Sequence, residues 1–367
     1  MSKKEKILII TPSFIPLLGG MEEQCYLLGR EFLRCGYGVD ILTERTKLEL
    51  PKFEAVDGLN VFRISNVRNR NVFGYISIAS SLVKFVYRRR NEYKFCIIRT
   101  LTFHALIVGL LKFLHLVRFK TIATAETGGD EDDLMLLKKR KLSKLFVKIL
   151  NHHDFLNSIC NDNFKHYKNL GFDYNKLTRF YNGIDVSFFD KADYPLKISN
   201  FLFIGRLVKE KGLFELLEAF KKVSSKYPAV KLFIGGDGLG KDYVINFIKE
   251  NKLEENIKYL GFISRDKKRS FFARGDCVVL PSYSEGFPIS IIEATLYKRL
   301  IISTDISDLK SLYKKNIIFC KKRDCKDLYT KIIYTIENYS KSSLDYSHVI
   351  KKVDIRNLSS RLVDLME

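Results

Sequence analysis

The sequence predicts an α/β protein of two domains, each built around a parallel β-sheet. Short apolar runs alternate with amphipathic stretches of helical length along most of the chain, which is typical of βαβ units. The length of 367 residues suits two hydrophobic cores better than one. Apolar residues make up 46% of the chain and aromatic residues 13%, so a largely disordered chain is excluded.

Charge and cysteine content narrow the function classes. The formal net charge of +21 calls for an acidic partner or surface, and both nucleic acid and anionic lipid qualify. A nucleic-acid-binding function rests on charge alone, because the sequence carries no recognisable recognition helix, RNA-binding aromatic signature or zinc knuckle; we expect no nucleic acid partner. The seven cysteines form no CxxC pair, which favours a reducing compartment over a disulfide framework or a zinc site.

No segment resembles a leader or a membrane span. The apolar run Ile7–Ile10 is too short for a signal peptide. The longest apolar stretch, Ala105–Phe119, is interrupted by Lys112, His115 and Arg118, and it falls short of the roughly 20 residues that a span requires. We therefore expect a cytoplasmic protein.

The first half of the chain predicts alternating strands and helices joined by right-handed crossovers. The segment between residues 43 and 61 reads as a polar connection. The expected strands are 6–11, 38–43, 61–64, 94–99, 120–124, 155–159 and 176–181. The expected helices are 21–34, 73–90, 103–116, one from Leu134, and 162–170.

Two loops of this half carry candidate residues. Gly19 and Gly20 open the first helix, where adjacent glycines let another molecule approach the backbone and the helix N–H groups behind them; the alternative is a tight strand-to-helix turn. An acidic loop at 123–133 includes Glu126, whose carboxylate could orient a hydroxyl or stabilise a cation. Its later acids could instead cap the following helix. His104, at the start of another helix, is a further candidate on the same edge, or a structural histidine.

Three stretches mix cations with apolar residues at helical spacing. A helix that lies on a membrane surface needs apolar atoms for the acyl boundary and charge for anionic headgroups. The alternative for each stretch is an ordinary amphipathic helix with a solvated lysine face. The stretches are 81–90, 110–120 and 138–148.

The second half follows the turn Asn182-Gly183-Ile184-Asp185 and a polar crossing at 190–200. Its expected strands are 201–205, 230–235, 258–263, 276–280 and 300–305, with helices from Leu213, through Phe272, from Pro288 and along the remainder to Glu367. The first strand leads to Arg206 and Lys211, a guanidinium fork and an ammonium suited to a diphosphate; the alternative is a basic surface loop. The second strand ends at Gly236, where a nucleotide could lie close to the backbone.

The segment Pro281–Ala294 follows a buried strand and turns through a loop into a helix. It carries Glu285 and Glu293 with seven residues between them. Pro288 suits the first helical turn, where its missing N–H costs no hydrogen bond. The helix N-terminus offers free N–H groups to a phosphate or a sugar hydroxyl. In an open parallel sheet, this is also where ligands bind.

This segment resembles the Glu-x7-Glu signature of retaining glycosyltransferases of family 4. Three further motifs resemble that family: Gly-Arg-x4-Lys-Gly at 205–212 is similar to its phosphate clamp, Gly-Gly-x-Glu at 19–22 to its first loop, and Asn-Gly-Ile-Asp at 182–185 to the end of its first domain. The resemblance implies the GT-B fold, two Rossmann-like domains with parallel sheets that face each other across a cleft. It implies an acceptor-binding domain at 1–185, a nucleotide-sugar-binding domain at 186–345, and a C-terminal helix at 346–367 that returns to the first domain.

The resemblance also assigns roles. Glu285 would contact the donor sugar and Glu293 the ribose hydroxyls, while Arg206 and Lys211 would neutralise the leaving diphosphate without a metal or other cofactor. The family's usual acceptor-side histidine has no counterpart in the loop at 123–133, so Glu126 is the candidate replacement, with His104 also on the acceptor side. The residues expected to bind the donor are Gly19, Gly20, Gly236, Phe262, Gly286, Phe287, Pro288, Ile289, Ser290 and Glu293.

We therefore expect a retaining glycosyltransferase. Its donor would be a nucleoside-diphosphate sugar, and its acceptor a lipid-linked or surface glycan of the kind found in polysaccharide or lipopolysaccharide biosynthesis. The basic first domain predicts a peripheral contact with the inner face of an anionic membrane. The alternative within this fold is a nucleotide-sugar epimerase, which would release a changed sugar nucleotide without using an acceptor.

Overall fold

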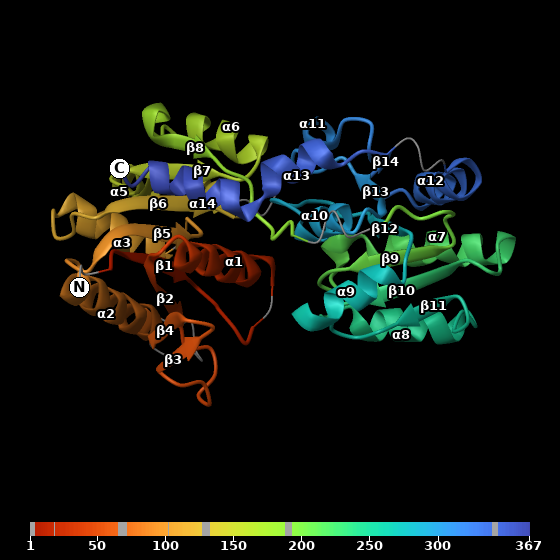
Figure 1. Cartoon of the computed structure of the whole chain (residues 1–367), viewed down its shortest axis with the longest axis horizontal. Coiled ribbons are helices and arrows are strands. Elements are labelled where there is room, and N and C mark those ends of the chain that lie inside the picture. Colours follow the sequence, from red (N-terminus) through yellow and green to blue (C-terminus); the bar gives the residue numbers. More distant parts are fainter. Residues whose placement is uncertain are drawn as a thin grey trace. The chain divides into compact units, whose positions relative to one another are not determined.

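A computed structural model describes residues 4–17, 19–64, 72–101, 103–126, 133–187, 193–339 and 344–367. The chain forms two compact units (Figure 1). The N-terminal unit comprises Met1–Asp185 together with Asp354–Glu367, and the C-terminal unit comprises Val186–Val353. Of the helices in these ranges, none combines the length and the apolar character needed to cross a membrane.

The described part of the N-terminal unit contains one eight-stranded sheet with the strand order β3-β4-β2-β1-β5-β6-β7-β8. All neighbours in it pair in parallel except β3 and β4. The strands are β1 (Lys6–Thr11), β2 (Gly38–Glu44), β3 (Phe53–Val56), β4 (Leu59–Ile64), β5 (Tyr93–Arg99), β6 (Lys120–Ala125), β7 (Phe155–Ser158) and β8 (Leu177–Arg179).

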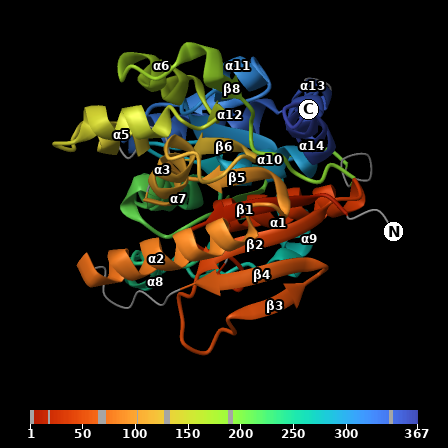
Figure 2. The ribbon, with the colours of Figure 1, turned by 90° about the vertical axis from the view of Figure 1, so that its left-hand side faces the viewer.

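Helices cover both faces of this sheet. On one face, α1 packs against β1, β2 and α14; on the other, α3 packs against β5 and between α2 and α5 (Figure 2). Successive residues of β1 serve the two cores alternately, with Ile7 and Ile9 in one and Leu8 and Ile10 in the other, as the two-residue period of a strand requires. The helices are α1 (Gly20–Arg34), α2 (Val72–Arg89), α3 (Phe103–Phe113), α4 (Asp133–Lys138), α5 (Ser143–Leu150), α6 (Asn161–Asn169) and α14 (Ile355–Asp364).

The described part of the C-terminal unit contains a six-stranded, fully parallel sheet with the order β11-β10-β9-β12-β13-β14. Its strands are β9 (Asn200–Ile204), β10 (Lys231–Gly235), β11 (Ile257–Tyr259), β12 (Cys277–Leu280), β13 (Leu300–Thr304) and β14 (Ile318–Cys320). Its helices are α7 (Leu213–Lys226), α8 (Lys241–Glu250), α9 (Arg265–Ala273), α10 (Ile289–Leu296), α11 (Leu309–Tyr313), α12 (Cys325–Asn338) and α13 (Ser347–Val353).

The structure corrects the sequence-based expectations at three elements. The supposed polar connection before β4 contains β3, which pairs with β4 in an antiparallel hairpin through Asp57-Gly58. That dipeptide is a hairpin signal, because both of its residues adopt positive φ. The expected helical remainder contains the short strand β14. The cationic stretch 138–148 is not one helix, since α4 ends at Lys138 and α5 begins at Ser143.

The end of the chain divides between the two units. Helix α13 contacts α10 in the C-terminal unit, and α14 contacts α1 in the N-terminal unit. Asp354 separates the two helices, and its carboxylate accepts a hydrogen bond from the backbone N–H of Arg356. An aspartate at this position is a favoured N-cap, so a new helix starts where a single continuous helix was expected.

Each sheet reverses its strand order next to its first strand. In the N-terminal unit the reversal lies between β1 and β5, and in the C-terminal unit between β9 and β12. Loops that leave the carboxyl ends of such strands diverge to opposite sides and leave room for a ligand. Several of the predicted candidate residues, among them Gly19, Arg206 and Glu285, follow these strands.

Candidate active site

The loops after β9 and β12 are joined at the strand reversal of the C-terminal unit. The backbone N–H of Tyr283 donates to the carbonyl of Glu210 over 2.8 Å. Gly212 has φ of +70°, and a Cβ there would lie 2.2 Å from the carbonyl oxygen of Pro281. Only glycine suits that combination of positive φ and close approach. The loop that carries Lys211 is therefore fixed against the loop that carries Glu285.

This junction brings Lys211 and Glu285 together. The Lys211 ammonium forms an ion pair and a hydrogen bond with Oε1 of Glu285. The Ser282 hydroxyl donates to the same oxygen over 2.8 Å. Both charged side chains are mostly shielded from water, so their attraction is stronger than that of an exposed pair. The pair combines a carboxylate that accepts from hydroxyls with a cation that attracts phosphate.

Arg206 follows β9 by two residues, and its side chain is exposed. The neighbouring backbone is fixed, because the N–H of Leu207 donates to the carbonyl of Asp237 over 2.8 Å. Gly236 has φ of +144°, and a Cβ there would lie 1.9 Å from the carbonyl oxygen of Gly205. The glycine at 236 thus has a packing reason besides any contact with a nucleotide. No interaction among the described residues restrains the Arg206 guanidinium, which leaves it available to an anion.

The loop after β12 leads directly into α10. Pro288 is the N-cap, one position before the first helical turn in which it was expected, and Ile289 begins the helix. Proline supplies no capping side chain, so the first N–H groups of α10, at Ile289 and Ser290, can donate to a ligand. Phe287 is buried, and Ser307 donates its hydroxyl hydrogen bond to the carbonyl of Gly286. The loop is anchored on both sides of its glycine.

Glu293 lies one turn along α10 and forms an ion pair with Lys268 of α9. One turn further, the ring of Tyr297 stacks on Phe272 of α9, with centroids 4.7 Å apart. Burial, followed by the charge of Glu293, raises the pKa of Tyr297 to about 12. Sequence reasoning missed Lys268, since it is one of several adjacent cations on a polar helix and only tertiary packing selects it.

Phe262 follows the edge strand β11 and is half exposed. The preceding Gly261 has φ of +70°, which turns the chain at the end of the strand. An exposed aromatic ring at the carboxyl edge of the sheet can stack on a nucleotide base.

In the N-terminal unit, Glu126 pairs with Arg99 at the end of β5. Arg99 contacts both carboxylate oxygens, with Nη2 2.8 Å from Oε2, and Nη2 also donates to Oδ1 of Asn182 over 2.8 Å. Asp133 accepts from the backbone N–H of Glu126 over 3.2 Å. Burial raises the pKa of Glu126, and the Arg99 guanidinium opposes that effect. The remainder of the acidic loop, Thr127–Asp132, lies outside the described residues.

His104 lies at the start of α3, near the same edge of the sheet. It is buried, and its Nε2 lies 3.3 Å from Oε1 of Glu44, the last residue of β2. The structure thus gives this histidine a carboxylate neighbour within its own unit. Glu126 is held by Arg99 instead, so the two candidates for the acceptor side have separate partners.

Gly19 is the N-cap of α1 and Gly20 its first residue. The carboxylate of Glu22 folds back toward Gly19. A Cβ on residue 19 would lie only 2.5 Å from Oε2 of Glu22. The Ser13 hydroxyl donates to the other carboxylate oxygen. Gly19 has an extended backbone, and a larger residue there would only displace the end of the Glu22 side chain.

Among the described residues, no group of three or more His, Cys, Asp and Glu side chains is arranged to hold a metal ion. The site offers cations of its own, Arg206 and Lys211, as groups able to balance a diphosphate charge. All seven cysteines are free thiols, and most of them are buried.

Two family models match adjacent parts of the chain. Residues 18–188 match the model described as Glycosyltransferase Family 4, and residues 188–352 match the model described as Glycosyl transferases group 1. Among curated proteins, the chain is 22% identical over 324 residues to a protein of Methanocaldococcus jannaschii named uncharacterized glycosyltransferase MJ1607. That alignment covers 84% of this chain and 82% of the relative.

Solved structures share the architecture. Sucrose-phosphate synthase from Thermosynechococcus elongatus aligns with a TM-score of 0.80 at 15% identity, over 99% of this chain and 98% of that one. Anabaena Alr3699/HepE, in complex with UDP and glucose, aligns with a TM-score of 0.75 at 18% identity, over 99% of both chains. At these identities the likeness concerns the fold, and it confirms the predicted GT-B α/β fold.

Proposed function

Because this chain is a glycosyltransferase of GT-B fold, we propose that it moves a sugar from a nucleoside-diphosphate sugar to a hydroxyl, with retention of the anomeric configuration. The observation that carries the proposal is the Lys211–Glu285 pair at the reversal between β9 and β12. It combines a carboxylate for sugar hydroxyls with a cation for phosphate, next to the N-terminus of α10.

The donor occupies the carboxyl edge of the C-terminal sheet. Arg206 and Lys211 neutralise the diphosphate as it leaves, and stabilisation of that charge is the largest catalytic contribution. The backbone N–H groups from Gly286 to Ser290 hold the sugar and phosphate oxygens. These cations remove the need for a metal ion, so chelation with EDTA should leave turnover unchanged.

The nucleoside lies beyond the diphosphate. Glu293 accepts hydrogen bonds from the ribose hydroxyls, and its pair with Lys268 orients the carboxylate. Phe262 stacks on the base. In the N-terminal unit, Gly19 and Gly20 offer backbone contacts to a phosphate, because their missing side chains leave the start of α1 accessible.

The acceptor is a lipid-linked or surface-glycan hydroxyl bound by the N-terminal unit. Glu126 acts on the acceptor side as the replacement for a histidine in that loop, with its carboxylate oriented by Arg99. His104, whose Nε2 lies 3.3 Å from Oε1 of Glu44, also acts on the acceptor side. The structure of Anabaena Alr3699/HepE in complex with UDP and glucose supports a nucleotide sugar as the donor class.

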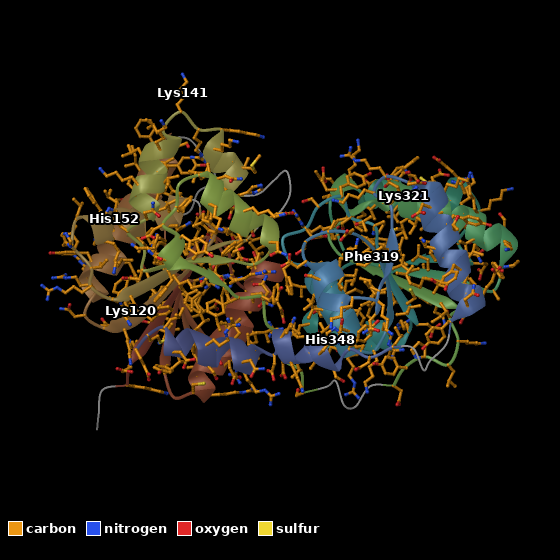
Figure 3. All side chains as sticks on the ribbon, turned by 90° about the horizontal axis from the view of Figure 1, so that it is seen from above. Lys120, Lys141, His152, Phe319, Lys321 and His348 are labelled. Atoms are coloured by element: carbon orange, nitrogen blue, oxygen red, sulfur yellow. The ribbon has the colours of Figure 1, made fainter. Side chains whose placement is uncertain are left out.

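We also propose that an anionic membrane presents this acceptor. Helices α2, α3 and α5 form one layer of the N-terminal unit, and large apolar side chains are exposed along it. Phe73 is 80% exposed, and cations interleave with the apolar residues, most densely at the α4–α5 turn, where Lys141 projects outward (Figure 3). Exposed apolar atoms beside cations match a headgroup boundary. The other exposed apolar residues of the layer are Tyr75, Ile76, Val83, Tyr87, Leu110, Phe113, Leu114, Leu142 and Leu145.

Flotation with phosphatidylglycerol vesicles tests this surface. We expect binding at low salt that falls as salt rises, and that weakens in the double variant Leu142→Ser/Leu145→Ser. The matched control is Leu196→Ser, which removes an exposed leucine from the C-terminal unit. Equal binding by neutral vesicles, or no binding at low salt, would remove the membrane from the proposal.

Assays across a panel of nucleotide sugars test the reaction itself. We expect one donor to be hydrolysed slowly and one nucleoside diphosphate to raise the melting temperature. With an acceptor, the anomeric configuration of the product should match that of the donor by NMR. A changed sugar nucleotide formed without any acceptor would instead establish an epimerase.

A further inference from the structure

Tyr283 joins the two loops of the candidate site through its side chain as well as its backbone. Its hydroxyl lies 2.8 Å and 3.0 Å from the two carboxylate oxygens of Glu215, while its backbone N–H donates to Glu210. Two residues after Tyr283 comes Glu285, and four residues before Glu215 comes Lys211. One tyrosine thus connects the segments that carry the two members of the ion pair.

Glu215 is a buried carboxylate that no cation contacts in the described part of the chain. It is 5% exposed and lies in the first turn of α7, where the helix dipole favours negative charge. The Tyr283 hydroxyl is its hydrogen-bond donor. A buried carboxylate without a donor is costly, so this bond strongly restrains the loop.

A third segment holds the tyrosine ring in place. The guanidinium of Arg323, after β14, lies 4.7 Å from the ring centroid of Tyr283. Burial, followed by the hydrogen bond and charge of Glu215, raises the pKa of Tyr283 to about 12. The hydroxyl therefore remains a protonated donor throughout the neutral range.

We propose that Tyr283 and Glu215 are positioning residues, whose hydrogen bond holds Glu285 opposite Lys211 in the arrangement that the transition state needs. The inference rests on the proposed function of that ion pair. The hydrogen bond between Tyr283 and Glu215 and the ion pair between Lys211 and Glu285 both connect the segment 211–215 with the segment 283–285. Without the first, the loop moves, and a small displacement of a charged group lowers the rate more than ground-state affinity.

The test compares kinetics with binding in the full-length protein. In Tyr283→Phe and in Glu215→Leu, kcat should fall about tenfold, while the Kd for the nucleoside diphosphate that binds best among UDP, GDP and ADP stays within about twofold. Glu215→Gln keeps an acceptor for the hydroxyl and should retain most of kcat. The control Tyr227→Phe removes a tyrosine–glutamate hydrogen bond from the other end of α7 and should change neither quantity.

Hydrogen exchange supplies a readout that does not depend on activity. Amides of the loop from 282 to 290 should exchange at least about tenfold faster in Tyr283→Phe and Glu215→Leu, and at the wild-type rate in Tyr227→Phe. Unchanged exchange and unchanged kcat in the first two variants would overturn the inference. So would a loss of nucleotide affinity equal to the loss of kcat.

A parallel measurement on Glu285→Gln tests the proposed function separately from the positioning role of Tyr283. If Glu285→Gln is inactive while Tyr283→Phe matches wild type in kcat and exchange, the positioning role fails and the proposed function stands. If Glu285→Gln is fully active, the proposed function fails. Faster exchange in Tyr283→Phe would then show only a structural restraint, and the positioning role in catalysis would be overturned as well.

Discussion

Each unit of this protein carries a shielded ion pair at the carboxyl ends of two neighbouring strands. In the N-terminal unit, Arg99 and Glu126 meet beside the ends of β5 and β6; in the C-terminal unit, Lys211 and Glu285 meet beside the ends of β9 and β12. The side chains are 5% and 7% exposed in the first pair, and 16% and 12% exposed in the second. The first pair is therefore the more completely removed from water.

The pairs also differ in geometry. Arg99 contacts both oxygens of Glu126 and also donates a hydrogen bond to Asn182. Lys211 contacts one oxygen of Glu285. A planar guanidinium fixes direction, but an ammonium on a flexible stem does not. We infer that the first pair fixes the orientation of Glu126, and that Lys211 and Glu285 of the second pair can exchange each other for a ligand.

Breaking the first pair should give the largest effect. Arg99→Ala leaves Glu126 and Asn182 buried without their common donor, and loss of one member of a buried pair costs about 3–5 kcal/mol. Hydrogen exchange of the β1 and β5 amides should report this loss of unfolding free energy in the N-terminal unit. The control Glu337→Gln, in an exposed pair with Lys226, should cost much less, because exposed pairs contribute little to stability. A similar small cost for Arg99→Ala would erase the contrast between the pairs.

The two units should also differ in how their stability depends on pH. Burial lowers the pKa of His153 from 6.5 to about 4, and the ring is held by the carbonyl of Ala105 and the hydroxyl of Thr121. Between pH 6.5 and pH 4 the unfolded chain binds a proton at this histidine and the folded chain does not. The free energy of unfolding therefore falls as the pH falls from 6.5 toward 4, by about 3 kcal/mol at most.

The measurement is the pH dependence of unfolding between pH 7 and pH 4. We expect the N-terminal unit to bind about one more proton on unfolding than it does in His153→Gln. The C-terminal unit, whose single histidine is His348, should lack this contribution. Identical pH profiles for the wild type and His153→Gln would show that this histidine titrates normally in the folded unit.

Breaking the second pair should lower turnover more than it lowers stability. Glu285→Gln and Lys211→Met should each lower kcat about 100-fold, because a preorganised charge at the leaving group or sugar is lost. Their unfolding free energies should fall less than that of Arg99→Ala, because the Lys211–Glu285 pair is less completely removed from water. Lys209→Met, at a neighbouring position of the same turn, is the control. Full activity in Glu285→Gln and Lys211→Met would place the active site elsewhere.

The smallest expected effect is that of Glu293→Ala, which distinguishes the role of Glu293 from that of Glu285 in the C-terminal unit. Glu293→Ala should weaken binding of the nucleoside diphosphate about tenfold, equivalent to about 1.4 kcal/mol, through loss of the ribose contacts. Glu285→Ala should instead lower turnover more than it lowers affinity for the bare diphosphate. Isothermal titration and initial rates distinguish these results, and the reverse pattern would exchange the roles of the two glutamates.

The β-strands that prediction missed have physical explanations. β3 was hidden because its residues alternate in exposure at the edge of the sheet, although Asp57-Gly58 marked its hairpin. β14 is three residues long, too short for a period to be recognised. Buried central strands such as β1 and β12 were found, since a continuous apolar run is strong evidence for a parallel sheet.

The sequence by itself determined the alternation of strands and helices, the order of the motifs, and the chemical types at the site. A run of apolar residues or a Gly-Phe-Pro turn encodes a local preference that does not depend on a distant neighbour. Only the tertiary structure decided which charges meet: Arg99 with Glu126, Lys211 with Glu285, Lys268 with Glu293, and Tyr283 with Glu215. The physical reason is that pairing depends on strand order and helix packing, and the energy of a charge depends on burial, neither of which is a property of any short stretch of chain.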